Sequence, residues 1–215
     1  MNKFIPLLLS AFILTGCNVE DIVNEPENDP NDDQQTTTDT TTTVDVSKLT
    51  SVVLIELLNG SGIPLAAQIK DKKAEAMTYL NRNEAGLVSD IDVEKVGATD
   101  NGMDNYLWTV GSSKYAGECT FTFSKSIKYV SLKLSSHQKV HDGTATAFTS
   151  YGTITFDGVT TEHFMPAFTT AGEYNYVDVV KTSVNGTTTL TIKSLDSKAD
   201  VNDYRVAVHN LTVAY

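Results

Sequence analysis

The sequence is short of several kinds of residue, and each shortage excludes a class of protein. Only two cysteines occur in 215 residues, Cys17 and Cys119, so a scaffold held together by several disulfides is excluded. The chain has no G-x-S-x-G elbow, no H-E-x-x-H pair and no phosphate-binding loop, which are the familiar catalytic motifs. It also lacks a basic stripe that would follow a nucleic-acid backbone, so no nucleic-acid partner is expected.

Positive charge is missing altogether from residues 18–46, which carry nine acidic residues and no Lys or Arg. This stretch contributes −9 to the net charge of −11 and Lys3 contributes +1, so residues 47–215 carry only −3. Low apolar content with one sign of charge cannot bury enough surface to offset the entropy of ordering. We therefore predict a disordered, acidic, threonine-rich tether over residues 17–47; an acidic tail that binds cations is the alternative.

Residues 1–16 have the parts of an export signal. Lys3 supplies the positive charge, and the apolar run over residues 5–14 is about half the roughly twenty residues that a membrane-spanning helix needs. The stretch Leu14–Thr15–Gly16–Cys17 resembles the lipobox of bacterial lipoproteins. That resemblance implies that Cys17 is acylated, becomes the first residue of the mature chain and places its lipid in a membrane. The expected location is extracytoplasmic, at the cell surface or the periplasmic face; an ordinary secretory signal is the alternative.

The remaining residues, 48–215, have the alternation of strands separated by turn residues. Residues 118–123 and 126–135 each alternate apolar and polar side chains, and residues 124–126 are predicted to connect them as a hairpin. Cys119 lies on the apolar face of the first of these strands, which indicates a buried, inert thiol; an exposed reactive thiol is the alternative. The closing strand changes register, which indicates a bulge near His209 and Asn210.

Turns are predicted where Gly follows Asp or Asn, at Asp157–Gly158, Asp142–Gly143 and Asn185–Gly186. Residues 70–81 are rich in helix formers and predict one short helix. The apolar run just before it, from residue 51, fits either a buried strand or a helix. Together these patterns predict an all-β domain, an antiparallel two-sheet sandwich of jelly-roll type with one short helix.

A second resemblance covers roughly residues 96–215. The segment Gly111–Gly117, GSSKYAG, followed by an alternating strand, resembles a motif of exported β-sandwich domains of low-GC bacteria, and the closing strand RVAVHNLTVAY looks like the last strand of those domains. Both are similar to jelly-roll carbohydrate-binding modules. The resemblance implies a glycan that stacks on aromatic rings, for which the candidates are Trp108, Tyr106, Tyr115, Tyr151 and Tyr174. The alternative for Trp108 is that it fills the core.

Two groups of residues have the chemistry of a metal site. Asp100, Asn101 and Asp104 surround Gly102, and clustered oxygen ligands on a turning backbone suit a structural Ca²⁺; an Asx-rich turn without a metal is the alternative. The triplet of His137, His141 and Asp142 is the second group, with solvated loop histidines as the alternative. No other cofactor is expected.

The sequence as a whole predicts a non-catalytic binding domain, with a glycan as the expected ligand. One alternative is a structural or adhesive protein that binds another surface protein. The other is an extracellular hydrolase, which would need two acidic residues at a fixed separation. Its candidate carboxylates are Glu118, Asp157, Glu162 and Glu173.

Overall fold

The computed structural model describes residues 43–100, 105–137, 139–141, 144–168, 170, 173–196 and 203–215. Cys17, the signal and most of the tether lie outside these ranges. The elements are η1 (Val46–Lys48), β1 (Ser51–Ile55), η2 (Ile69–Lys72), α1 (Lys73–Leu80), β2 (Val88–Glu94), β3 (Val96–Asp100), β4 (Tyr106–Val110), β5 (Glu118–Ser136), β6 (Lys139–His141), β7 (Thr144–Thr146), β8 (Ser150–Phe156), β9 (Val159–Met165), β10 (Val177–Ser194) and β11 (Val206–Ala214).

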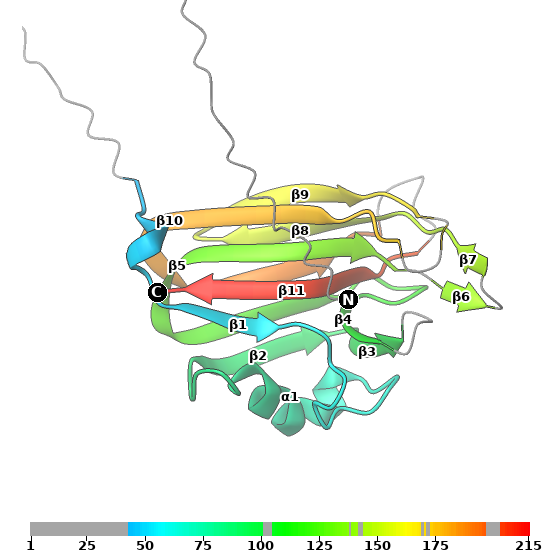
Figure 1. The fold of residues 1–215 in the computed structure, drawn as a ribbon, viewed down its shortest axis with the longest axis horizontal. Coiled ribbons are helices and arrows are strands. Elements are labelled where there is room, and N and C mark those ends of the chain that lie inside the picture. The colour runs from blue at the N-terminus through cyan, green and yellow to red at the C-terminus, as the bar shows by residue number, and fades with distance from the viewer. Residues whose placement is uncertain are drawn as a thin grey trace, which may run out of the picture. The chain divides into compact units, whose positions relative to one another are not determined.

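The described strands form an antiparallel sheet of nine strands and a separate pair, β6–β7. The main path runs β3-β4-β11-β5-β10-β8-β9, with β1 added to β11 and β2 added to β5 (Figure 1). This sheet is strongly curled, so that its two halves face each other across the core as the layers of a sandwich. The predicted all-β antiparallel sandwich with one short helix is confirmed, and the predicted helix is the η2–α1 segment (Ile69–Leu80).

The two longest strands join the layers, and here the predicted hairpins are wrong. β5 runs without a turn for 19 residues through the predicted connection at residues 124–126, and β10 likewise runs through Asn185–Gly186. The first part of β5 pairs with β2, and its last part pairs with β11. The register between β5 and β10 shifts around Ile127 and Thr187, so the irregularity is a bulge inside two continuous strands.

Two other local predictions are confirmed. Asp157 and Gly158 connect β8 to β9 with φ of 51° and 71°, the left-handed pair that a tight type I′ hairpin requires. In β11 the register against β5 shifts between Val208 and Asn210, where the change of parity predicted a bulge. The run from residue 51 is the strand β1, and Asp142–Gly143 lies outside the described residues.

The core contains Cys119 and Trp108, both fully buried. Burial raises the pKa of the Cys119 thiol well above its ordinary value, because the thiolate would lose its hydration. The predicted inert thiol therefore has the expected environment. Among the described residues, no helix has the length and apolar character needed to cross a membrane.

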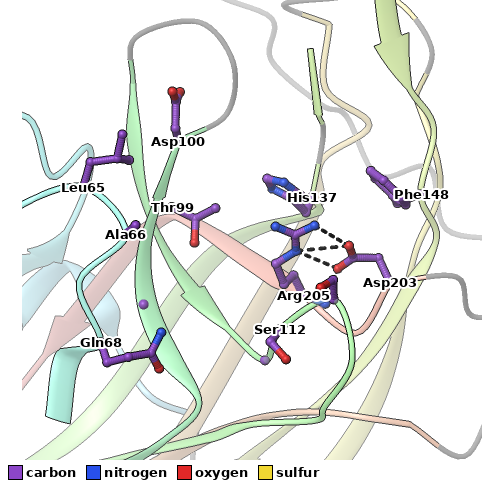
Figure 2. Close-up of a pocket in the computed structure, with 13 residues that line it drawn as sticks. Leu65, Ala66, Gln68, Thr99, Asp100, Ser112, His137, Phe148, Asp203 and Arg205 are labelled. Atoms are coloured by element: carbon purple, nitrogen blue, oxygen red, sulfur yellow. Dashed lines mark hydrogen bonds and ion pairs between the residues drawn. The ribbon is translucent and has the colours of Figure 1, made fainter. Parts of the chain in front are cut away.

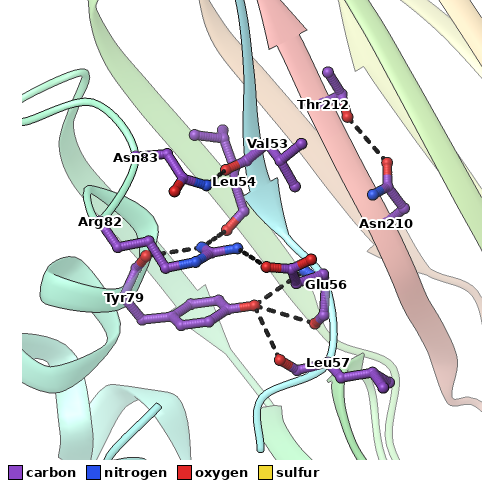
Figure 3. A network of polar contacts seen from close by, with 9 residues as sticks. All are labelled: Val53, Leu54, Glu56, Leu57, Tyr79, Arg82, Asn83, Asn210 and Thr212. Atoms are coloured by element: carbon purple, nitrogen blue, oxygen red, sulfur yellow. Dashed lines mark hydrogen bonds and ion pairs between the residues drawn. The ribbon is translucent and has the colours of Figure 1, made fainter. Parts of the chain in front are cut away.

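Side chains from the end of α1 and the residues after it cover the free edge of β1 (Figure 3). Arg82 donates from Nη1 to the carbonyl oxygens of Leu54 (2.7 Å) and Tyr79 (2.9 Å), and Asn83 Nδ2 donates to the carbonyl of Val53 (2.9 Å). The Tyr79 hydroxyl accepts from the Glu56 amide at 3.0 Å. The bonds to Val53 and Leu54 satisfy carbonyl groups of β1 that a neighbouring strand would otherwise satisfy, and the bond to Tyr79 satisfies a carbonyl at the end of α1.

Candidate functional site

A cavity of about 770 Å³ lies where several strands end. Its polar lining comes from β3 (Thr99, Asp100), the β4–β5 loop (Ser112, Ser113) and the residues just before β11 (Asp203, Arg205). His137 follows β5, Phe148 precedes β8, and Leu65, Ala66 and Gln68 precede η2. We call this cavity the end pocket (Figure 2).

The loop Gly111–Gly117, which carries the GSSKYAG motif, forms a fixed wall of the end pocket. Gly111 has φ +92°, and a Cβ there would overlap the carbonyl oxygen of Tyr204 and Oγ of Ser194. A Cβ at Gly117 would lie 2.7 Å from two carbonyl oxygens of the β2–β3 connection. Gly117 N donates to Ser194 Oγ at 2.8 Å, and Ser194 N donates to Gly117 O at 2.9 Å. The glycines are therefore required by close backbone approach.

The opposite wall of the end pocket consists of β3 and the segment before η2, which are joined by backbone hydrogen bonds. Ala66 N donates to the carbonyl of Ala98 at 2.8 Å, and Ala98 N donates to the carbonyl of Ala67 at 3.0 Å. These bonds hold the segment that carries Leu65 and Gln68 against the strand that carries Thr99 and Asp100. The wall is therefore built from backbone pairing, which keeps its side chains in place.

The charged centre of the end pocket is the pair Arg205–Asp203. Arg205 Nε donates to Asp203 Oδ1 at 2.8 Å and to Oδ2 at 3.1 Å, and Nη2 donates to Oδ2. The carboxylate also accepts from the Arg205 backbone amide at 2.9 Å. Asp203 is only 1% exposed, so the pair is held in a low-dielectric environment. Nη1 of Arg205 makes no hydrogen bond within the described ranges, which leaves donors for a ligand.

An apolar wall completes the end pocket. The rings of His137 and Phe148 are stacked, with centroids 6.1 Å apart and planes at 18°. His137 is buried and Phe148 is half-buried. Figure 2 shows His137 close to the Arg205 guanidinium, with Thr99 and Asp100 on the other side of the view. A ligand in this pocket would therefore meet hydrogen-bonding groups and an aromatic face together.

Trp108 is not part of this site, which corrects its candidacy as a sugar platform. Its ring is fully buried and lies 6.0 Å from the ring of Phe121, centroid to centroid. A ring that is covered on both faces cannot stack on a sugar. The core alternative for Trp108 is the correct one.

The structure separates the four candidate tyrosines. Tyr106 is half-buried, and its amide donates to Asn59 Oδ1 at 2.7 Å. Tyr151 packs on Phe164 with centroids 4.9 Å apart. Tyr174 belongs to an aromatic cluster with His209, and neither residue lines the end pocket. Of the four, only Tyr115 is on the Gly111–Gly117 loop, and this residue is 60% exposed.

The metal predictions are only partly within the described residues. Asp100 lines the end pocket, whereas Asn101 and Asp104 lie outside the described ranges. His137 also lines the pocket, His141 lies in β6, and Asp142 is outside the ranges. In the described part of the chain no three His, Cys, Asp or Glu side chains are grouped to hold a metal ion. The calcium site stays a prediction.

None of the four carboxylates proposed for hydrolysis lines the end pocket. Glu118 pairs with Lys193 at 3.3 Å, and Asp157 accepts from Ser183 Oγ at 2.6 Å. Sequence reasoning missed Asp203, Arg205, Phe148 and Gln68 altogether. The only hint in the sequence was the charged triplet Asp203–Tyr204–Arg205, directly before an apolar strand. That triplet does not indicate which residues Asp203 and Arg205 would lie beside.

No known protein family and no curated protein sequence matches the chain. Among solved structures it is similar to a family 61 carbohydrate-binding module in complex with β-1,4-galactotriose, at 9% identity and TM-score 0.34, covering 60% of this chain and 90% of the other. It is similar to a family 36 module in complex with calcium and xylotriose, at 9% identity and TM-score 0.33, covering 77% and 99%. A family 29 module matches at 10% identity and TM-score 0.36, covering 78% and 89%. Similarity at this level says nothing about a ligand, which has to be argued from the site.

Proposed function

We propose that this protein is a non-catalytic binding protein and that the end pocket binds a carbohydrate. The observation that carries the proposal is the Arg205–Asp203 pair, buried and bidentate, beside the stacked rings of His137 and Phe148. A sugar presents hydroxyl groups that both donate and accept, together with an apolar face of C–H groups. A guanidinium with free donors, a carboxylate and an aromatic wall match those three properties.

The size and charge of the end pocket support the same class of ligand. Its volume of about 770 Å³ lies within the range of about 300–1,000 Å³ that is typical of small-molecule sites. The charged lining residues are two carboxylates, Asp100 and Asp203, and one cation, Arg205, which leaves a net charge of −1. A neutral, hydroxylated ligand therefore fits this pocket better than an anion.

The absence of the predicted carboxylate pairs from the pocket lining supports binding without hydrolysis. Asp203 is occupied by Arg205, so it is poorly placed to exchange a proton with a substrate. The proposed role is therefore recognition of a glycan.

The test is titration calorimetry of the full chain with neutral oligosaccharides of galactose, xylose and mannose. Phe148→Ala removes the apolar wall, and Gln68→Ala removes an amide from the opposite wall. Tyr151→Ala is the matched control, because Tyr151 is an aromatic residue outside the pocket lining. We expect saturable binding that falls at least about tenfold in the pocket variants, which corresponds to about 1.4 kcal/mol, and is unchanged in the control. Absence of binding by every sugar, or equal binding by all variants, would contradict the proposal.

A protein partner is the second candidate function, and the edge strand β9 favours it. β9 is the last strand of the main path, and Val159 and Phe164 near its ends are 59% and 44% exposed. A partner strand adding to this edge would pair with its open backbone groups. Glu162→Pro, which removes a backbone N–H that faces away from β8, should abolish such a complex and leave oligosaccharide binding intact.

We also propose that the chain is anchored in a membrane through acylated Cys17, as the lipobox resemblance implies. Cys17→Ser should leave an uncleaved or mislocalised precursor. Mass spectrometry of the mature N-terminus tests this, and a free N-terminus without lipid, or one at another residue, would contradict it.

A further inference from the structure

A second group of side chains with the chemistry of a binding site lies away from the end pocket. It consists of Tyr174 and Tyr176, just before β10, His209 in β11 and Lys133 in β5, and we call it the tyrosine platform. The rings of Tyr174 and Tyr176 are stacked with centroids 5.5 Å apart and planes at 25°. Tyr176 is 45% exposed, so part of this residue is open to solvent.

The ring of His209 packs against the rings of both tyrosines. Its ring meets that of Tyr174 at 4.5 Å and that of Tyr176 at 4.9 Å, both edge-on. The bulge in β11 sets its position, and its Nε2 is 2.8 Å from Ser135 Oγ. Burial, with a smaller contribution from Lys133, lowers the pKa of His209 to about 4, so it is neutral at ordinary pH. The platform therefore does not depend on a second positive charge.

Lys133 supplies a cation that has no carboxylate partner within the described ranges. Its cross-strand neighbour is Asp178, yet the two form no ion pair, and no other described carboxylate pairs with Lys133. The ammonium lies instead 5.0 Å from the centroid of the Tyr176 ring. A partly exposed aromatic ring and a cation are thus next to each other, and a sugar that stacks on Tyr176 would move the ammonium from over the ring to its rim.

We infer that the tyrosine platform binds an acidic sugar unit, a uronic acid, with its C–H face on Tyr176 and its carboxylate against the Lys133 ammonium. The charge complementarity selects an anion, and the aromatic face selects a ring with an apolar side. This inference extends the proposed carbohydrate binding to a second site. It uses none of the residues that line the end pocket.

The test compares trigalacturonate with the neutral galactose trisaccharide of the same linkage, using the full-length protein in low and high salt. The wild type should bind the acidic trisaccharide at least about fivefold more tightly in low salt, and high salt should reduce that preference. Lys133→Met should lose the preference. Tyr176→Ala should lose binding to the platform, whereas Tyr176→Phe, which keeps the ring, should retain it. Asp178→Asn is the matched control and should keep or increase the preference.

The pocket variant Phe148→Ala separates this inference from the proposed function. If it abolishes binding of trigalacturonate while Lys133→Met has no effect, the acidic sugar occupies the end pocket and the inference is overturned. If neutral sugars do not bind but Lys133→Met removes trigalacturonate binding, the inference stands and the pocket proposal fails. Equal affinity for both trisaccharides in the wild type also overturns the inference.

Discussion

Two arginines of this protein are each held by a carboxylate, but they have different roles. Arg82 pairs with Glu56 at 2.8 Å, donates to two backbone carbonyls and lies 4.1 Å from the Tyr79 ring centroid. Arg205 pairs with Asp203 and keeps its Nη1 free of hydrogen bonds to the described residues. Both terminal nitrogens of Arg82 bond to neighbouring groups and close a sheet edge, whereas Nη1 of Arg205 has no partner among the described residues and Arg205 lines a cavity. Spare hydrogen-bonding capacity next to open volume therefore distinguishes a binding site from a structural network.

The strongest test of the contrast between the Arg82 and Arg205 clusters is a substitution at Asp203. Replacing it with Ala leaves the Arg205 guanidinium largely buried without its counter-charge, which should lower the free energy of unfolding by about 3–5 kcal/mol. Oligosaccharide binding should be lost as well. Chemical denaturation and calorimetry measure the two effects. Asp203→Asn keeps the shape and should give a smaller loss of stability, so equal stability of Asp203→Ala and the wild type would show that the pair is not buried in solution.

Stability should also depend on pH in the acidic range, where buried histidines become protonated while both arginines keep their charge. The pKa of His209 falls from 6.5 in the unfolded chain to about 4 in the fold, so the unfolded state binds more protons between these values. The stabilisation is complete above about pH 6.5 and is lost as the pH falls toward 4, by at most about 3 kcal/mol. His163, whose pKa is also lowered by burial, acts in the same direction. Denaturation at several pH values should show a shallower slope in His209→Asn; an identical slope would contradict the burial of His209.

Arg82→Ala should lower the stability of the fold without changing oligosaccharide binding. It removes two charged hydrogen bonds to carbonyls and the contact with Tyr79, so we expect a loss of about 2 kcal/mol of stability. Oligosaccharide affinity should be unchanged, because Arg82 lies outside the pocket lining. A loss of affinity in a folded Arg82→Ala protein would break the distinction between the two clusters.

Glu56→Gln should have the smallest effect. The Glu56 side chain is 59% exposed, and an exposed ion pair contributes at most about 1 kcal/mol. The same change at Asp203 should cost clearly more, since that carboxylate is excluded from water. Parallel denaturation of Glu56→Gln and Asp203→Asn gives the difference directly, and similar losses would contradict the contrast in burial.

Local sequence patterns predicted the structure correctly where a pattern is compatible with only one kind of structure. The parity change between Val208 and Leu211 indicated the bulge in β11, and Asp157–Gly158 indicated a hairpin. Asn185–Gly186 has the same composition but lies inside β10, where Gly186 has φ +74°. A turn and a bulge both use a residue with positive φ, so the dipeptide alone does not tell them apart. The difference depends on whether neighbouring strands continue alongside.

The sequence by itself determined the faces of the strands, the burial of Cys119 and the short helix, because each depends on a periodicity of two or of 3.6 residues within one segment. It also marked Gly111–Gly117 as a distinctive loop. Only the tertiary structure decided that this loop, Asp100, His137, Phe148 and the Asp203–Arg205 pair line one cavity. These residues come together because β11 pairs with β4 and β5, across about 70 to 100 residues of chain. Pairing over such separations is set by the packing of the whole sheet, and no local pattern contains it.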